Sequence, residues 1–263
     1  MASTDLIRCF HPADRSAARA LCLPHAGGSA SFFFALSRSL SPEVEVLAAQ
    51  YPGRQDRRHE APLTDLGSLA DQVVSGLDDF LDRDLIVFGH SLGATLGFEV
   101  VRRLERVGVA VRHLIVSGRR APSCPADGGL HTLLDDALIA EMRALAGDEL
   151  PLPDDEMLQI ALPAVRADYC AVETYRYDGG PPIGCPVTAI YGENDPRVTP
   201  AMVSRWAEHT VGGFRTVVVP GAHFYLAGQV DTVRSLVRAV ATEPAGDSPR
   251  AEVPAIRIDE GDT

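Results

Sequence analysis

Short apolar runs alternate along the chain with longer segments in which apolar residues recur at a helical spacing. Strands are expected at residues 20–23, 44–50, 84–88, 113–117, 187–191 and 216–219. Helices are expected at residues 63–81, 92–107, 200–211 and 230–241, the first of them capped by Thr64 or Asp65. Repeated strand–helix units of this kind predict an α/β fold, with a mainly parallel sheet covered by helices on both faces.

The stretch from about residue 122 to residue 182 interrupts this alternation. It contains two helical patterns, at residues 132–145 and 154–169, and no convincing strand, and proline and glycine flank it at both ends. We expect a helical insertion that lies over the sheet as a lid. Ordinary crossover helices in a longer connection are the alternative.

The length of 263 residues suits one domain with an inserted subdomain. We expect the folded domain to cover residues 1–242. The tail at residues 243–263 is rich in Pro, Glu, Asp and Gly and has few large apolar residues, so it is predicted to be disordered.

The charge and the cysteines narrow the class of protein. A formal net charge of −12 argues against binding to nucleic acid or to an anionic membrane, because both require clustered Lys and Arg. The first residues lack the pattern of a signal peptide, and no apolar run is long enough to span a membrane. The five cysteines are scattered and odd in number, which is typical of free thiols in a reducing compartment. We therefore expect a cytoplasmic protein.

The strongest chemical signal is Gly89-His90-Ser91-Leu92-Gly93, which matches the pattern G-x-S-x-G. A predicted strand runs directly into it and a predicted helix leaves it. In this context the serine occupies a strained turn that lifts its hydroxyl above the end of the sheet, as in the α/β-hydrolase fold. Ser91 is therefore the expected nucleophile.

A serine hydroxyl needs a base, and in this fold the acid and then the histidine follow the serine along the chain. Asp195 lies just after the strand expected at 187–191, and Glu193 is the competing carboxylate in the same loop. His223 follows the strand at 216–219, whereas His209 lies within a predicted helix. We expect Ser91, His223 and Asp195 to form a triad, with Asp195 preferred over Glu193.

The tetrahedral intermediate needs an oxyanion hole. The backbone amide after the nucleophile, that of Leu92, is the first expected donor. The loop at residues 23–28 (LPHAGG) follows an early strand, and its glycines permit the unusual backbone that aims an amide inward. The Ala26 amide is the second expected donor. Neither this mechanism nor the spacing of His, Asp and Glu calls for a metal or another cofactor.

Together these segments resemble one known group, the type II thioesterases that edit polyketide and nonribosomal peptide assembly lines. The matching segments, in order, are residues 23–28 (LPHAGG), 51–54 (YPGR), 89–93 (GHSLG), 166–169 (RADY), 173–177 (ETYRY) and 221–224 (GAHF). The resemblance covers roughly residues 7–241. A departure from the family pattern is Leu92, where many members have Met.

The resemblance implies an α/β-hydrolase that hydrolyses acyl thioesters on the phosphopantetheine arm of acyl or peptidyl carrier proteins. It carries Ser91, Asp195 and His223 over as the triad and the Ala26 and Leu92 amides over as oxyanion donors. A general serine carboxylesterase or an acyltransferase remains an alternative, because the same residues serve those reactions. A non-catalytic relative would lack a member of the triad, and none is missing.

The sequence indicates less about how a partner protein is bound than about the catalytic residues. Carrier proteins are usually acidic, as this chain is, so we hypothesise that a local basic patch binds them. The candidate arginines are Arg54, Arg57, Arg58, Arg119 and Arg120. The absence of sustained heptads predicts a monomer.

Overall fold

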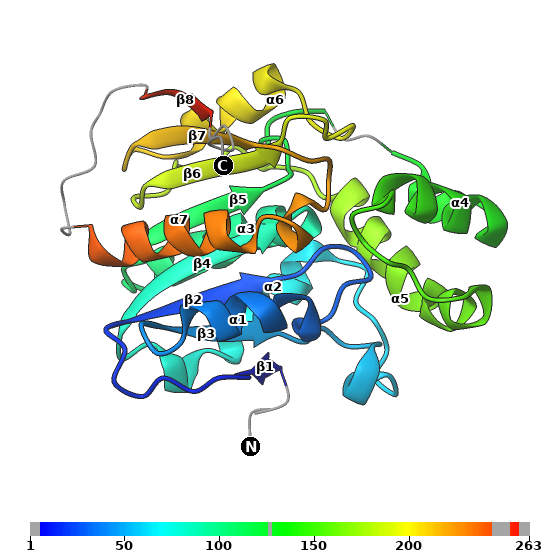
Figure 1. Ribbon diagram of the computed structural model, residues 1–263, viewed down its shortest axis with the longest axis horizontal. Helices are drawn as coiled ribbons and strands as arrows, with labels where there is room; N and C mark the ends of the chain where they lie inside the picture. Colours follow the sequence, from blue (N-terminus) through cyan, green and yellow to red (C-terminus); the bar gives the residue numbers. More distant parts are fainter. Residues whose placement is uncertain (1–5, 126–127, 244–252, 258–263) are drawn as a thin grey trace, which may run out of the picture.

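The structure is a computed structural model that describes residues 6–125, 128–243 and 253–257. Its strands are β1 (Ile7–Arg8), β2 (Ala18–Leu23), β3 (Val44–Ala49), β4 (Asp84–His90), β5 (His113–Ser117), β6 (Val187–Gly192), β7 (Phe214–Val219) and β8 (Val253–Arg257). Within the described ranges they form one sheet in the order β1-β3-β2-β4-β5-β6-β7-β8 (Figure 1). Only β1 and β3 pair antiparallel in it. The predicted α/β class is therefore confirmed.

Helices cover both faces of this sheet. The helices of the described chain are α1 (Phe34–Leu40), α2 (Leu66–Ser75), α3 (Leu92–Arg106), α4 (Asp135–Ala146), α5 (Asp155–Thr174), α6 (Pro200–Ser204) and α7 (Val230–Thr242). Helices α1 and α7 lie side by side on one face, and α2 and α3 pack together on the other (Figure 1). The arrangement is that of the α/β-hydrolase fold.

The pleat of the strands explains why both faces can be covered. In β2, Leu21 and Leu23 join the apolar cluster with α2 and α3, whereas Ala20 and Cys22 join the cluster with α1 and α7. Successive side chains of a strand point to opposite faces, so a continuous apolar run supplies two cores at once. All six residues of β2 are buried.

Helix boundaries differ from the sequence expectation in two places. The helix expected over residues 63–81 is α2, which begins after Asp65, whose carboxylate accepts the Ser68 N–H at 2.7 Å. It ends at Gly76. The helix expected over 200–211 is the short α6 followed by a 3-10 helix, Arg205–His209. The sequence pattern also missed β1 and α1.

The region between β5 and β6 holds the expected helical insertion. Its helices α4 and α5 project beyond the end of the sheet, at the right of Figure 1. They share a small apolar cluster of their own, whose buried members are Leu138, Ile139, Leu158, Leu162 and Val165. We refer to α4, α5 and the loop joining them as the lid.

The C-terminal tail was expected to be disordered from residue 243 onward. The structure instead places Val253–Arg257 as β8, parallel to the edge strand β7. An edge strand offers unpaired backbone donors and acceptors, which an extended segment can satisfy whatever its sequence. Residues 244–252 and 258–263 lie outside the described part of the chain.

Among the described residues, no helix is long and apolar enough to cross a membrane.

Candidate active site

Ser91 stands in the turn between β4 and α3. Its backbone has φ 56° and ψ −114°, a conformation that residues other than glycine rarely adopt. A Cβ at Gly89 would lie 2.0 Å from the Gly93 carbonyl oxygen, and one at Gly93 would lie 2.0 Å from the Leu23 carbonyl oxygen. Both glycines are therefore required for the strand and helix to meet closely enough to raise Ser91, as the G-x-S-x-G context predicts.

Asp195 and His223 meet at the same end of the sheet. His223 Nδ1 lies 2.9 Å from Asp195 Oδ2, and both side chains are almost completely buried. The other carboxylate oxygen of Asp195 accepts the Arg197 N–H at 2.8 Å, which fixes the carboxylate. Because the Nδ1–H donates to Asp195, His223 Nε2 remains an acceptor for a serine proton. The side chain of the competing Glu193 is exposed.

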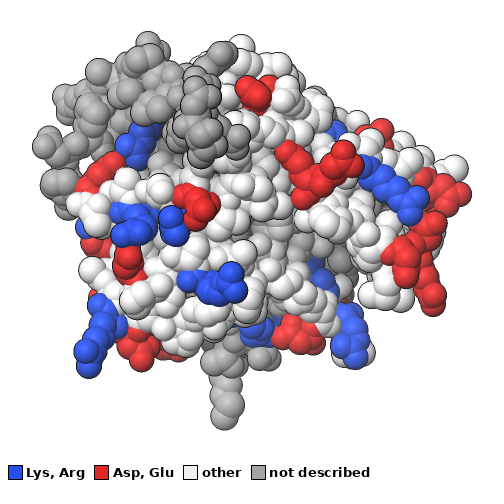
Figure 2. Space-filling model, viewed as in Figure 1, with Lys and Arg blue, Asp and Glu red and all other residues white. Residues whose placement is uncertain are grey.

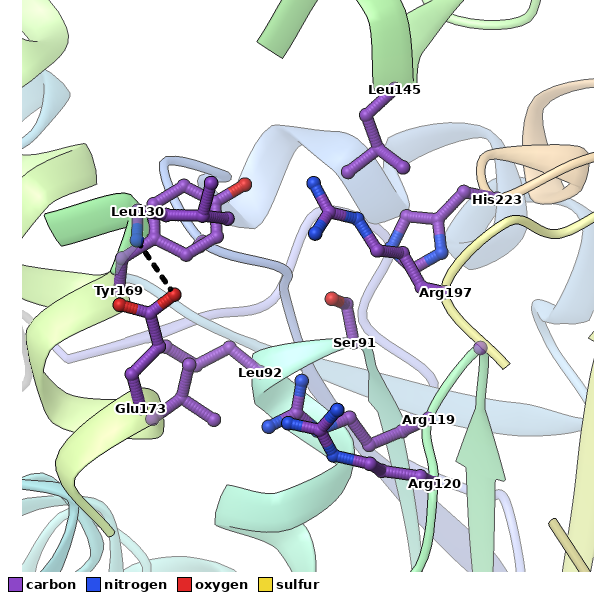
Figure 3. A pocket seen from close by; sticks show the side chains of 13 residues that line it. Ser91, Leu92, Arg119, Arg120, Leu130, Leu145, Tyr169, Glu173, Arg197 and His223 are labelled. Atoms are coloured by element: carbon purple, nitrogen blue, oxygen red, sulfur yellow. Dashed lines mark hydrogen bonds between the residues drawn. The ribbon is translucent and has the colours of Figure 1, made fainter. Parts of the chain in front are cut away.

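Ser91 and His223 line one pocket together with both predicted oxyanion donors, Ala26 and Leu92. In Figure 3 the Ser91 hydroxyl points into this pocket and the His223 ring lies at its edge. The lid closes the opposite side through Leu145 of α4 and Tyr169 of α5. The site is therefore built from the sheet on one side and the lid on the other.

Two further histidines lie near the base: His90 packs beside His223, and His25 packs beside His90. The His90 ring centroid lies 5.1 Å from that of His223, and the His25 ring lies 5.9 Å from that of His90. Burial lowers the pKa of His25 to about 3 and holds the pKa of His90 well below its usual range. Both rings are therefore neutral at pH 7. An uncharged His90 ring therefore lies next to the His223 ring, with the uncharged His25 ring next to His90.

Three of the five arginines predicted to form a basic docking patch are buried, so the prediction is wrong for them. Arg54 is buried and paired with Asp168 of α5, and Arg57 is buried and paired with Glu60. Arg120 is also buried, and it lines the active-site pocket with Arg119. Arg54 contacts the buried Asp168, and Arg57 also donates to the buried Gln50 carbonyl at 2.7 Å, so both guanidinium groups serve contacts within the fold.

Of the five candidate arginines, Arg58 alone has an exposed side chain in the described structure. On the face drawn in Figure 2, basic and acidic side chains are interspersed and the lid carries mainly acidic ones. The exposed acidic residues of α4 and α5 are Asp135, Asp136, Glu141, Asp155 and Glu156. An acidic carrier protein would therefore not be attracted to this side of the lid.

Nothing in the sequence indicates that Arg54 and Asp168 form a buried ion pair. Burial raises the pKa of the Asp168 carboxyl, and the adjacent Arg54 guanidinium opposes that rise. The same carboxylate accepts the Gly27 N–H at 2.7 Å. It therefore connects the lid to the loop that contains Ala26.

A serine raised on a strained turn and a histidine oriented by a buried aspartate can carry out acyl transfer. Ala26 and Leu92, whose amides are the predicted oxyanion donors, line the same pocket as the serine. Among the described residues, no three His, Cys, Asp or Glu side chains are grouped so that they could hold a metal ion. The fold and this site define a serine hydrolase of the α/β-hydrolase class.

Comparison with known proteins identifies the family. The family model of the thioesterase domain matches residues 19–242 of this chain. A probable cadicidin biosynthesis thioesterase of Streptomyces griseus is 44% identical over 246 residues, which cover 93% of this chain and 68% of the relative. Thioesterase PikA5 of Streptomyces venezuelae is 50% identical over 226 residues, covering 85% and 80%.

A solved structure agrees with these relatives. The type II thioesterase BorB from the borrelidin biosynthetic cluster superposes with a TM-score of 0.87 at 45% identity, covering 92% of this chain and 99% of BorB. The chain therefore belongs to the thioesterase family, and the resemblance to type II thioesterases predicted from its motifs is confirmed. It is a serine hydrolase that acts on thioesters.

Proposed function

We propose that this enzyme removes acyl groups from the phosphopantetheine arm of acyl or peptidyl carrier proteins in a polyketide or nonribosomal peptide assembly line. The observation that carries the proposal is the lid-covered pocket that joins Ser91 to His223 in a chain of this family. The relatives named for cadicidin and borrelidin biosynthesis support the setting. Hydrolysis would return the carrier to its free thiol form.

The first half of the reaction transfers the acyl group to the enzyme. Ser91 Oγ attacks the thioester carbonyl carbon while His223 Nε2 takes the hydroxyl proton. The oxyanion accepts hydrogen bonds from the Ala26 and Leu92 amides. When the C–S bond breaks, the imidazolium of His223 donates that proton to the departing thiolate, and Asp195 stabilises the imidazolium meanwhile.

The second half releases the acid. Water attacks the acyl carbon of the Ser91 ester while His223 again takes a proton, and the C–O bond to Ser91 Oγ then breaks as that oxygen is reprotonated. The enzyme returns to its starting state using only protein groups and water, and we expect no metal or other cofactor to take part. We expect the protein to act as a monomer. Its cysteines are all free in the described structure, which suits the cytoplasm.

The test is mass spectrometry of a carrier protein loaded with a short acyl thioester and incubated with the enzyme or with Ser91→Ala. We expect the parent to release the free phosphopantetheine thiol and the variant to leave the acyl group in place. Retention of the acyl group by a parent enzyme that still cleaves aryl esters would favour a general esterase. Transfer of the acyl group to an added alcohol or amine would favour an acyltransferase.

A further inference from the structure

Two carboxylates of the lid accept hydrogen bonds from the two loops that carry the chemistry. Asp168 of α5 accepts the Gly27 N–H at 2.7 Å. Glu149, in the loop between α4 and α5, accepts the Ala222 N–H at 2.5 Å and the Phe224 N–H at 2.8 Å. Both contacts join the lid to backbone atoms, so each acts on the course of a catalytic loop rather than on one side chain.

Asp168 is itself held firmly in place. It is 2% exposed and paired with Arg54, whose guanidinium lies 5.2 Å from the centre of the Tyr51 ring. The Tyr51 hydroxyl in turn donates to the Pro24 carbonyl at 3.2 Å, at the start of the same loop. Hydrogen bonds therefore fix the loop at both ends, and the one next to Ala26 is that from the Gly27 N–H to Asp168.

Gly27 shows how closely the lid approaches this loop. Its φ is 77°, and a Cβ there would lie 2.7 Å from Val165 Cγ2 of α5. The Gly27 amide belongs to the peptide unit that follows Ala26, so fixing it restricts the rotation of Ala26. The direction of the Ala26 N–H, the second oxyanion donor, therefore depends on where α5 lies.

Glu149 acts on the opposite wall of the pocket. The two amides that it accepts belong to the residues immediately before and after His223. Hydrogen bonds to an ionised acceptor are shorter and about twice as strong as neutral ones. One carboxylate thus fixes the backbone on both sides of the base, while Asp195 fixes its ring.

We propose that Asp168 and Glu149 are positioning residues, through which the closed lid sets the oxyanion amide of Ala26 and the backbone of His223. The proposal rests on the catalytic roles assigned above. A displacement of about 1 Å at a reacting group costs on the order of 100-fold in rate. The active site is therefore complete only while the lid is in contact with both loops.

The first test concerns Glu149, which is only partly buried. We expect Glu149→Ala to lower kcat toward a small acyl thioester by about 10- to 100-fold with little change in KM or melting temperature. Glu149→Gln keeps one acceptor oxygen but sets its NH2 group against the other backbone N–H, so it should recover only part of that loss. Asp148→Ala removes the neighbouring exposed carboxylate and is the matched control, with kcat equal to that of the parent.

The second test concerns Asp168. Asp168→Asn retains an oxygen for the Gly27 N–H, and the double variant Arg54→Met, Asp168→Leu removes both charges together. We expect near-parent kcat for the first, with a lower melting temperature because the buried Arg54 loses its counter-charge. For the second we expect a kcat loss of about 10- to 100-fold at an unchanged melting temperature. The double variant avoids a lone buried arginine, which would itself disturb the fold.

A fluorophosphonate that labels the active serine separates the possible outcomes, because its rate depends on base and oxyanion hole without carrier recognition. Slower labelling of Glu149→Ala and of the double variant, with Ser91→Ala unlabelled, supports the positioning roles. Parent-like labelling and kcat in both variants overturns them and leaves the proposed function intact. An unlabelled parent, or an active Ser91→Ala, removes the catalytic assignment instead.

Discussion

The nucleophile elbow and the lid line the same pocket, yet they are held in place in different ways. At the elbow, backbone meets backbone: only a hydrogen atom fits at Gly89 and Gly93 between β4, α3 and the end of β2. The lid instead has a small apolar cluster of its own, joins the main core through Ala171 and Val172 of α5, and reaches the catalytic loops through the hydrogen bonds of Asp168 and Glu149. The position of the nucleophile is thus a property of the sheet, whereas the surroundings of the oxyanion loop and the base depend on a few polar contacts.

The largest expected effect lies on the sheet side of this comparison. Asp195→Asn should leave the fold intact and lower kcat by about 10⁴-fold, because the amide no longer selects the tautomer of His223 that accepts the serine proton. Steady-state kinetics with a small thioester measure this. Glu193→Gln, which changes an exposed carboxylate two residues away, is the control with parent activity. Equal losses in both variants would mean that the loop, and not the Asp195 contact, matters.

An intermediate effect separates the stability of the two regions. Leu96 of α3 and Leu138 of α4 are both fully buried, the first in the main core and the second in the lid cluster. Leu96→Ala should lower the free energy of unfolding by about 2–5 kcal/mol and the melting temperature by on the order of 10 °C. Leu138→Ala should mainly accelerate proteolysis within the lid. An equal fall in melting temperature for both would show that lid and sheet unfold as one unit.

The smallest expected effect comes from histidines buried on the sheet side. Burial lowers the pKa of His25 and of His113 to about 3, whereas an unfolded histidine has a pKa of about 6.5. The unfolded state therefore binds more protons below pH 6.5, and the free energy of unfolding falls as the pH drops from about 6.5 toward about 3. Above pH 6.5 this contribution to stability is fully present.

The contribution of one such histidine can be measured at His113, whose Nε2 lies 2.8 Å from Thr188 Oγ1 inside the sheet. Between pH 7 and pH 5, urea unfolding of the parent should lose about 2 kcal/mol more than that of His113→Gln, since the glutamine takes up no proton. A parallel loss of stability in parent and variant would show that His113 is protonated in the folded state.

The chain itself determined the strands, the class of the fold and the order of the chemistry. Ser91, Asp195 and His223 could be predicted as a triad because each lies just after a strand, and the carboxyl ends of parallel strands meet at one edge of a sheet. The strand–turn–helix context of Ser91 is likewise local, and the close contact that requires a glycine at Gly89 is with Gly93, four residues along the chain. Local signals of this kind can be read without the tertiary structure.

Only the tertiary structure decided what the lid does to the site. Asp168 and Gly27 are 141 residues apart in the chain, and Glu149 and Ala222 are 73 apart. Nothing in the neighbourhood of either carboxylate indicates its partner, because the hydrogen bond depends on how the whole insertion packs. The same holds for Arg54: its position beside a turn suggests an exposed charge, and its burial follows from a carboxylate 114 residues away. Periodicity and motifs describe what a segment needs locally, whereas the pairing of distant polar groups is settled only when the layers of the fold come together.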